Sequence, residues 1–575
     1  MKKIFLSIII TFIAGIAVVF GIGFFKEPDY VTKSHSSVEV NRTWKVALSH
    51  YVNETGLSLT VDGEVLDSKT SGAAYMSEDM ELMLEKDAVT ELFDCAVNLY
   101  DGENLTISRG ETDIQVDVND ASSMQINGQN VELEHSPVKT DSKVFIPAEI
   151  LTGGIGFSYD WDKDSRVVTM NCLEPDKPWL PSYYNYADIG KISFARDQGN
   201  LGTCWAFAAL SALESTLLPE EDDDFSEDHL IHNNGFGLNL EDGGDYIMAL
   251  AYLSSWKGPV FEEDDPYGDD ETDPTLEPVK HIQEVQIVEN KDYQKIKEMI
   301  YKYGAVESSI YISLLDATTI DTEYFDPYFN SYCYPDQAVP NHEIIIIGWD
   351  DNYPASNFTK PVSKDGAFIC RNSWGSNFGD NGIFYVSYED SVIGSGGEVY
   401  TGIEPTSNYD NIYQYDPCGW IGRVGYNKNH GYFANVYTAE GNESLQAVSF
   451  YATGPSTSYK VYVVTEVGPD NSGVISLKGI SPSAEGSFKN AGYYTVKLPS
   501  PVDLNAGEDY AVVVEIDTPG SSHPIAMEIN ADDMRTQPVV LDGKRSYISN
   551  YGDVWENTQA SSQCNVCLKA FTNNR

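Results

Sequence analysis

The sequence predicts an α+β protein in which a central segment of mixed helices and strands lies between two β-rich segments. Three observations support this prediction. Short alternating strands with tight turns fill residues 44–174, an apolar helical run and an apolar strand stand in residues 175–405, and longer strands follow in residues 406–575. A chain of 575 residues is expected to hold about three or four domains, so each segment is long enough for its own core.

The first 25 residues form a candidate membrane segment. Lys2 and Lys3 precede residues 4–25, which are apolar and carry no charge. A helix of this length spans about 33 Å, enough for the hydrocarbon core of a bilayer. The sequence at residues 21–26 is a poor signal-peptidase site, which favours an uncleaved signal anchor over a cleaved signal peptide. The lysines keep the N-terminus inside, so either interpretation exports the rest of the chain.

Residues 26–43 are polar and are expected to form a tether to the first β-rich domain, residues 44–174. In that domain Asp62-Gly63 and Asn127-Gly128 stand between alternating apolar and polar runs. Such dipeptides are typical of two-residue hairpin turns, because both positions tolerate positive φ. The segment is therefore predicted to be a series of short hairpins.

Two later stretches of this domain, residues 144–151 and 156–162, carry a resemblance to a known module. They resemble the small β-rich domain of copper amine oxidase N-terminal regions, which also occurs in many bacterial envelope proteins. No copper ligands accompany the match. The resemblance therefore implies a stalk, or a domain that binds envelope material, rather than a redox centre.

A thiol stands at the start of the apolar helical run in the central segment. Cys204 follows Gln198 and two glycines, and residues 205–213 are almost entirely apolar. A cysteine at a helix N-terminus lies at the positive end of the helix dipole, which favours the thiolate. The amide of Gln198 can donate a hydrogen bond toward the place where an oxyanion would form.

Two later segments complete a pattern with this thiol. His342 directly precedes an apolar strand at residues 344–347, and Asn372 opens the sequence Asn-Ser-Trp-Gly at residues 372–375. The separation of Cys204 and His342 falls within the roughly 130–150 positions found between the thiol and the histidine of papain-type enzymes. Cysteine, histidine and Asn-Ser-Trp-Gly in this order resemble the papain-like (C1) cysteine peptidases.

That resemblance implies a role for each residue. Cys204 would be the nucleophile, and His342 would be the base that forms a thiolate–imidazolium pair with it and later protonates the leaving amine. Asn372 would accept from the far imidazole nitrogen and fix the ring. Gln198 and the backbone N–H of Cys204 would form the oxyanion hole. The resemblance implies no metal and no cofactor.

The family also implies a fold and a substrate cleft. The fold has two lobes, one helical and one a β-barrel. Gly243 and Gly244 resemble the paired glycines whose bare backbone lines the cleft and receives the peptide as a strand. Asn341 would line the main specificity pocket, and Trp374 would shield the histidine–asparagine hydrogen bond from water.

Three positions test or break the family pattern. Ser226 is expected to cap the helix that follows it, at the position of a family motif. Leu201 replaces the usual cysteine, so the family's disulfide at this point cannot form. No inhibitory pro-helix is recognisable before Gln198, which leaves open how activity is restrained.

Composition excludes some partners. The 88 acidic and 36 basic residues give a formal net charge of −52, which excludes nucleic acid as an expected partner because phosphate binding needs clustered Lys and Arg. The acidic runs at residues 220–224 and 262–265 lack the spaced ligands of a calcium loop, so solvated loops are favoured. Cys564 and Cys567 have no second CxxC pair and are expected in a strand rather than at zinc.

Residues 406–575 contain strand-like runs separated by Gly, Pro and Asn turns, which predicts a β-sandwich or jelly roll. The segment resembles the lectin-like domain appended to C1-type peptidases of Gram-positive bacteria. A glycan is therefore a candidate partner. Tyr413, Tyr415, Trp420 and Tyr432 could stack on sugar rings, but aromatic residues at alternating positions are more often part of a sandwich core.

Together these features predict an exported cysteine endopeptidase that hydrolyses peptide bonds through a thioester acyl-enzyme. It would be held by a single membrane helix with its catalytic domain outside the cell, or secreted if the helix is cleaved. One alternative is a surface adhesin or glycan-binding protein that uses the peptidase fold as a scaffold. Another is a transpeptidase with the same nucleophile. The sequence leaves open the substrate preference and the choice between endo- and exopeptidase.

Overall fold

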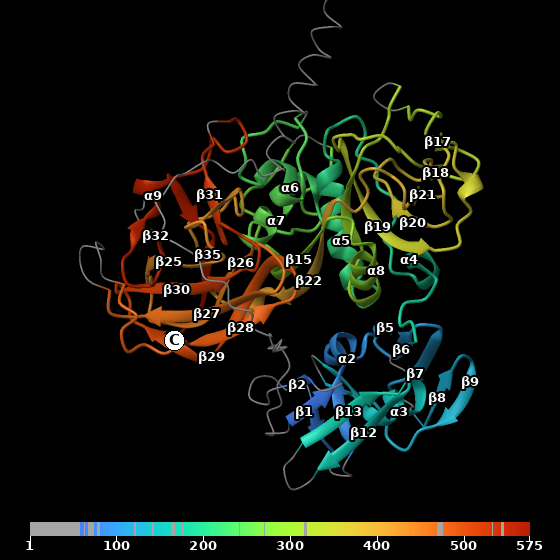
Figure 1. Ribbon diagram of the computed structural model, residues 1–575, viewed down its shortest axis with the longest axis horizontal. Coiled ribbons are helices and arrows are strands. Elements are labelled where there is room, and N and C mark those ends of the chain that lie inside the picture. The colour runs from blue at the N-terminus through green and yellow to red at the C-terminus, as the bar shows by residue number, and fades with distance from the viewer. Residues whose placement is uncertain are drawn as a thin grey trace, which may run out of the picture.

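The computed structural model describes residues 58–575, with short interruptions at 62–63, 67–73, 78–80, 120–121, 141–142, 163–166, 174–176, 241, 269–270, 316–318, 468–474, 532 and 542–544 (Figure 1). The predicted membrane segment and tether, residues 1–43, lie outside the described residues. Within the described part of the chain, no helix is long and apolar enough to cross a membrane. Helices and strands are mixed along the chain, as the predicted α+β class requires.

The described residues of the N-terminal domain form three small sheets and two short helices. Strand β1 pairs in parallel with β13, and β5 to β9 form an antiparallel meander. The predicted hairpin at Asn127 and Gly128 is present between β8 and β9, with φ of 50° and 78° at the two turn residues. The elements are β1 (Ser58–Val61), β2 (Glu64–Leu66), β3 (Ala74–Met76), β4 (Leu82–Glu85), α2 (Lys86–Phe93), β5 (Ala96–Tyr100), β6 (Asn104–Arg109), β7 (Thr112–Asp117), β8 (Ser123–Ile126), β9 (Gln129–Glu132), β10 (Val138–Lys139), β11 (Val144–Pro147), α3 (Ala148–Gly154), β12 (Phe157–Asp162) and β13 (Val167–Cys172).

The N-terminal domain packs against one side of the central domain, below helix α8 in Figure 1. Lys302, at the end of α8, donates to Asp94 Oδ1 at 2.6 Å, and Tyr100 Oη donates to the carbonyl of Ile189 at 2.9 Å. These contacts lie on α8 and on the chain just before the central helix. These polar contacts hold the N-terminal domain to the central domain.

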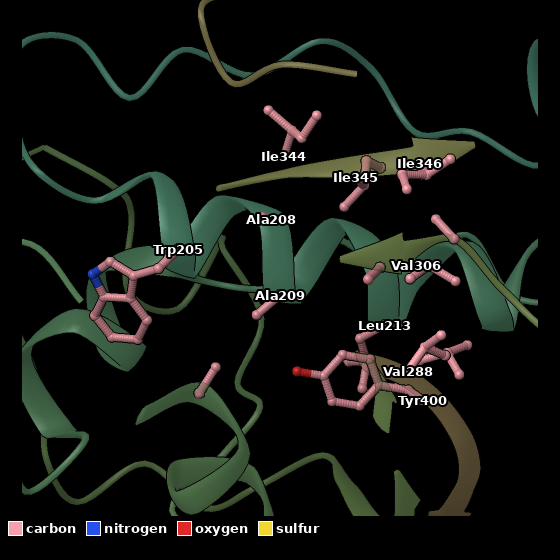
Figure 2. Close-up of a cluster of buried hydrophobic side chains, with 14 of the residues drawn as sticks. Trp205, Ala208, Ala209, Leu213, Val288, Val306, Ile344, Ile345, Ile346 and Tyr400 are labelled. Atoms are coloured by element: carbon pink, nitrogen blue, oxygen red, sulfur yellow. The ribbon is translucent and has the colours of Figure 1, made fainter. Parts of the chain in front are cut away.

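One buried helix, α5, organises the central domain. Its side chains are apolar on almost every face, so it is covered by α6, α7 and three strands, β16, β19 and β22. Figure 2 shows Trp205 and Leu213 of α5 in the same cluster as Val306, Ile345 and Tyr400 of these strands. The elements are β14 (Tyr183–Asn185), α4 (Tyr186–Ile189), α5 (Cys204–Leu217), α6 (Glu227–Asn233), α7 (Tyr246–Ser254), β15 (Lys280–Glu289), α8 (Tyr293–Lys302), β16 (Val306–Ile310), β17 (Phe325–Asp326), β18 (Ser331–Tyr332), β19 (His342–Asp350), η1 (Ala355–Asn357), β20 (Ala367–Arg371), β21 (Ile383–Ser387) and β22 (Gly396–Pro405).

The predicted division at residue 405 falls inside a continuous sheet. Strand β15 of the central domain pairs on one edge with β22 and on the other with β29 of the C-terminal domain, where Ile287 lies opposite Ala491. The resulting six-stranded sheet runs in the order β22-β15-β29-β26-β35-β23. The two domains are therefore joined through backbone hydrogen bonds and not through a tether.

The C-terminal domain is a β-sandwich, as predicted. A second six-stranded sheet, β28-β27-β30-β25-β32-β33, packs on the shared sheet across a core that includes Phe433, Phe450 and Val512. The elements are η2 (Thr406–Asn408), β23 (Asn411–Tyr413), β24 (Gly422–Val424), β25 (His430–Thr438), β26 (Glu443–Ala452), β27 (Thr457–Val464), β28 (Ala484–Phe488), β29 (Ala491–Leu504), β30 (Asp509–Asp517), β31 (Ile525–Ile529), β32 (Ser546–Ser549), β33 (Glu556–Asn557), α9 (Thr558–Ser561), β34 (Cys564–Val566) and β35 (Leu568–Asn574).

Candidate active site

Cys204 is the first residue of α5, as the apolar run predicts. Its thiol is half-buried, and the backbone N–H groups of Trp205 and Glu343 interact with the sulfur. Glu343 directly follows His342 at the start of β19. The structure therefore brings the N-terminus of the central helix and the start of β19 together, although they are far apart in the sequence.

His342 and Asn372 form the second part of the site. The Nε2 atom of His342 lies 2.7 Å from Oδ1 of Asn372, and both side chains are buried. Because the amide oxygen accepts, the hydrogen of the neutral imidazole sits on Nε2 and Nδ1 is the acceptor. The indole of Trp374 lies with its centroid 5.0 Å from that of the imidazole, and its shielding of the hydrogen bond stays a prediction.

Gln198 is held between two backbone segments. Its Oε1 accepts from Ser373 Oγ at 2.6 Å, and its Nε2 donates to the carbonyl of Leu201 at 2.8 Å. The backbone N–H of Gln198 also donates to the carbonyl of Ser373 at 2.9 Å. One amide hydrogen of Nε2 is satisfied by Leu201, which leaves the second for a substrate oxygen. Ser373 thus orients Gln198, a function that the sequence alone did not assign to it.

The electrostatics of the site differ from the sequence prediction. Burial raises the pKa of the Cys204 thiol to about 12, with the nearby Glu343 carboxyl adding to the shift. Burial also lowers the pKa of His342 to about 4, against a smaller opposing effect of the Asn372 hydrogen bond. Burial thus opposes the effect of the helix dipole on the thiol, and it favours the uncharged forms of both Cys204 and His342. Moving the thiol proton to His342 creates two opposite charges at once, which attract each other across a site of low dielectric.

The paired glycines are required by close packing. A Cβ on Gly244 would lie 2.5 Å from the indole of Trp205, and Gly243 adopts a φ of +78° in the left-handed region. A Cβ on Gly202 would in turn lie 3.1 Å from the backbone N of Gly243. This backbone therefore runs directly beside the start of α5, next to Cys204.

Asn341 has a structural role beside the site. Its side chain bonds both backbone groups of Ile312, accepting from the N–H at 2.8 Å and donating to the C=O at 3.0 Å. Its own N–H donates to the carbonyl of Ile310 at 3.1 Å. These bonds extend the pairing of β16 with β19 up to His342. The predicted place of Asn341 in a specificity pocket stays a prediction.

Other expectations near the site can be compared directly. Ser226 caps α6, because its Oγ accepts from the N–H of His229 at 2.9 Å, as predicted. Leu201 accepts a hydrogen bond through its backbone carbonyl from Gln198 Nε2. Cys564 lies buried in β34, which fits the strand interpretation of the CxxC pair.

The candidate sugar-binding aromatics are part of the C-terminal fold. Trp420 is 6 % exposed and packs 5.8 Å from the ring of Tyr451. The hydroxyl of Tyr415 donates to the carbonyl of Val436 at 2.8 Å, and Tyr413 donates to Glu443. Core packing is therefore the main role of these rings, as the sequence pattern favoured.

One group of side chains in the described residues brings three potential metal ligands together. Glu81, His135 and Glu149 of the N-terminal domain have ligand atoms within 4.8 Å of one another. Nδ1 of His135 lies 2.8 Å from Glu149 Oε2, and this hydrogen bond raises the pKa of His135. His135 Nδ1 also lies 3.9 Å from Glu81 Oε2, so the two carboxyls both favour the protonated form of this histidine.

Comparison with known families agrees with this geometry. Residues 180–403 match the family model of papain family cysteine proteases, residues 412–572 match that of the lectin like domain, and residues 60–170 match that of the copper amine oxidase N-terminal domain. The central domain therefore matches the papain family of cysteine proteases. It lies between a copper amine oxidase N-terminal domain and a lectin-like domain, which confirms the three resemblances that the sequence carries.

Curated relatives match mainly this central part. A viral cathepsin of Heliothis zea nuclear polyhedrosis virus is 30% identical over 257 residues, which cover 43% of this chain and 64% of the relative. Cysteine proteinase 1 of Entamoeba histolytica is 28% identical over 235 residues, covering 37% of this chain and 66% of the relative. The chain thus spans just under two thirds of the length of these relatives.

Solved structures of a clostridial protein extend the match to the C-terminal domain. Cysteine protease Cwp84 after propeptide cleavage is 27% identical with a TM-score of 0.60, covering 68% of this chain and 99% of that one. A second structure holds the cysteine protease and lectin-like domains of Cwp84, a surface layer associated protein of Clostridium difficile. It is 26% identical with a TM-score of 0.59, covering 68% of this chain and 89% of that one. Both structures share the order of protease and lectin-like domains.

Proposed function

We propose that this chain is an exported cysteine peptidase that hydrolyses peptide bonds at Cys204. One observation supports the proposal most: the domain that matches the papain family contains a thiol at a helix start, a His342–Asn372 hydrogen bond and a Gln198 amide held by Ser373. A protein that used the fold only as a scaffold would have no need of these polar contacts. The geometry therefore favours a peptidase over an adhesin.

The first half of the reaction forms an acyl-enzyme. The Cys204 proton moves to Nδ1 of His342 as the sulfur attacks the carbonyl carbon of the scissile peptide. The second amide hydrogen of Gln198 and the backbone N–H of Cys204 donate to the resulting oxyanion. The tetrahedral intermediate then collapses, the C–N bond breaks, and the proton on His342 goes to the leaving amine. A thioester remains on Cys204.

The second half returns the enzyme to its starting state. His342 takes a proton from water, and the hydroxide so formed attacks the thioester carbonyl. The same two donors stabilise the second oxyanion, and the C–S bond breaks as sulfur regains a proton from His342. Throughout both halves Asn372 holds the imidazole in the tautomer that keeps Nδ1 toward the sulfur.

We further infer a location outside the cell and a carbohydrate partner for the C-terminal domain. The Cwp84 relatives, one of which is described as surface layer associated, support a surface or extracellular location. The lectin-like match supports carbohydrate binding by residues 412–572. Since Trp420 is buried, the sugar site is expected on other residues of the domain.

The function is tested on the full chain with an epoxide thiol-protease trap and a quenched peptide mixture. The trap is expected to form one covalent adduct on Cys204, and Cys204→Ala and His342→Ala should abolish cleavage. Gln198→Ala should reduce kcat/KM by about 10²-fold, as loss of one oxyanion donor. Cys172→Ala, which changes a partly buried cysteine of the N-terminal domain, is the matched control. Full activity of Cys204→Ala would show that the proposal is wrong.

A further inference from the structure

A group of buried carboxyl side chains lies beside Cys204 and has no part in the reaction described above. Glu307 of β16, Glu343 of β19 and Glu398 of β22 are 0 %, 1 % and 0 % exposed. The charges of Glu343 and Glu307 both raise the pKa of the Cys204 thiol, which places these carboxyls within electrostatic reach of the sulfur. The group therefore forms part of the surroundings of the reacting atoms.

Strand pairing explains how these residues come together. In the antiparallel pair of β16 and β19, Ser309 lies opposite Glu343 and Glu307 lies opposite Ile345. Residues directly opposite each other on paired strands project to the same face of the sheet, and so do residues two apart on one strand. Glu307 lies opposite Ile345, and Glu343 lies two residues before Ile345, so all three side chains share one face. Ile345 packs into the cluster around α5 (Figure 2). The two carboxyls therefore point toward α5.

The third carboxyl comes from the neighbouring strand. At Gly397 the backbone of β22 runs so close to β16 that an added Cβ would lie 1.8 Å from the carbonyl oxygen of Glu307. Glu398, the next residue, interacts electrostatically with both Glu307 and Glu343. Three carboxyls from three strands thus lie in the same part of the interior, within electrostatic reach of one another.

Few of their oxygen atoms have partners. Ser309 Oγ donates to Glu343 Oε1 at 2.7 Å, and Tyr400 Oη donates to Glu398 Oε1 at 2.6 Å. Among the described residues, no hydrogen-bond donor reaches either oxygen of Glu307 or the Oε2 atoms of Glu343 and Glu398. Buried acceptors in this number are costly unless a donor arrives from outside the protein.

The neighbouring cation is already engaged. Arg535 of the C-terminal domain donates through both terminal nitrogens to the two carboxylate oxygens of Asp245, each at 2.7 Å. Asp245 is the remaining acidic residue that interacts electrostatically with the three glutamates. Within the described part of the chain, the ion pairs give a cation to Asp245 and none to Glu307, Glu343 or Glu398.

We propose that Glu307, Glu343 and Glu398 form the recognition site for a lysine or arginine side chain of the peptide substrate, close to the scissile bond. An ammonium or guanidinium group supplies several donors and a positive charge, which are what the unpartnered oxygens lack. This inference rests on the proposed peptidase function of Cys204. It gives that function a substrate class, peptides with a basic residue near the cleavage point.

Tyr246 is an aromatic residue within electrostatic reach of two of the carboxyls. This residue follows Asp245, is half-buried, and interacts electrostatically with Glu343, Glu398 and Glu289. Its ring also lines a pocket at the junction with the C-terminal domain, together with Glu289. A tyrosine ring offers a basic side chain a favourable cation–π surface.

Pairs of internally quenched peptides test the proposal on the full chain. The two peptides of a pair differ only in lysine or norleucine, which have stems of the same length, at one of four positions before the scissile bond. Wild-type protein is expected to show kcat/KM at least about tenfold higher for lysine at one of these positions. The Glu343→Gln/Glu398→Gln variant is expected to bring that ratio to about one, whatever its absolute rate on the norleucine peptide. Glu440→Gln, an exposed change in the C-terminal domain, should keep the wild-type ratio.

The outcomes separate this inference from the function on which it rests. Equal cleavage of both peptides of every pair by wild-type protein would overturn the inference and leave the peptidase assignment intact. An undiminished lysine preference in the double variant would also overturn it. No cleavage of any peptide and no epoxide adduct on Cys204 would overturn both. Labelling of Cys204 by the epoxide and an unchanged Tm show that the double variant is folded. If the variant does not fold, the ratio of kcat/KM for the lysine and norleucine peptides, measured on wild-type protein, still tests the proposal.

Discussion

Replacing Arg535 by methionine is expected to weaken the junction between the papain-like and lectin-like domains. Arg535 and Asp245 are 6 % and 7 % exposed, and the guanidinium contacts both carboxylate oxygens at 2.7 Å. The guanidinium also lies 5.3 Å from the ring centroid of Phe236. Methionine keeps much of the length and apolar stem but removes the charge, so Asp245 becomes a buried carboxylate without a partner.

The structure allows the size of this effect to be estimated. Removing one partner of a buried ion pair costs about 3–5 kcal/mol, because the remaining charge is left desolvated. Asp245 would then also face Glu343 and Glu398, whose charges repel its own. For a unit of about 150–250 residues, 1 kcal/mol lowers Tm by roughly 2–4 °C, so a decrease of roughly 6–20 °C is expected.

Differential scanning calorimetry of the full chain measures this shift. Arg575→Met is the matched control, because Arg575 pairs with Asp503 at 2.6 Å in a largely exposed ion pair. Such a pair contributes about 0–1 kcal/mol, so this control should leave Tm almost unchanged. The Arg535→Met/Asp245→Asn double variant should recover part of the loss. Equal, small shifts for Arg535→Met and Arg575→Met would refute the reasoning.

Three further predictions follow from the site and its surroundings. Asn372→Ala should lower kcat at least about tenfold, since the His342 tautomer is no longer fixed, and a pH–rate profile with an unchanged kcat would contradict this role. Ser226→Ala should lower the free energy of unfolding by about 1 kcal/mol through loss of the α6 cap, measured by urea denaturation. Burial raises the pKa of Glu343 and of Glu398 to about 8. The folded state therefore holds protons that the unfolded chain has lost, so stability should fall as pH rises from about 5 to 8, and the double Gln variant should flatten this dependence.

The residues of the candidate site could be predicted because each stands in a short local pattern. Cys204 begins an apolar helical run, His342 begins an apolar strand, and Asn372 ends one. Neighbouring residues set where a helix starts and where a strand ends. These positions can therefore be predicted without knowledge of the tertiary fold. The distance from His342 to Asn372 is in turn fixed by the pairing of β19 with β20.

The carboxyl group beside the site could not be predicted in the same way. Glu307, Glu343 and Glu398 lie in three separate parts of the sequence, and only the registers of β16, β19 and β22 bring them together. One signal was present: Glu343 is a charged residue at the edge of the apolar run at 344–347. Its carboxyl would be expected to need a partner if the strand were buried.

The protonation state of the thiol shows a second limit of sequence reasoning. The position of Cys204 at a helix start correctly predicts a dipole that favours the thiolate. The sequence does not reveal the depth of burial or the nearby Glu343, and both act in the opposite direction. Desolvation depends on tertiary packing, so a local electrostatic rule cannot include it.

The shared sheet changes how the domains should be regarded. An isolated fragment of residues 175–405 would leave the edge of β15 without β29 and would leave Asp245 without Arg535. An unpaired strand edge invites aggregation, and an unpaired buried carboxylate lies next to the group proposed to bind the substrate. The lectin-like domain is thus part of the structure that shapes the cleft, in addition to any glycan that it binds. Loss of activity in such a fragment would be expected from the missing sheet and ion pair, even with Cys204, His342 and Asn372 in place.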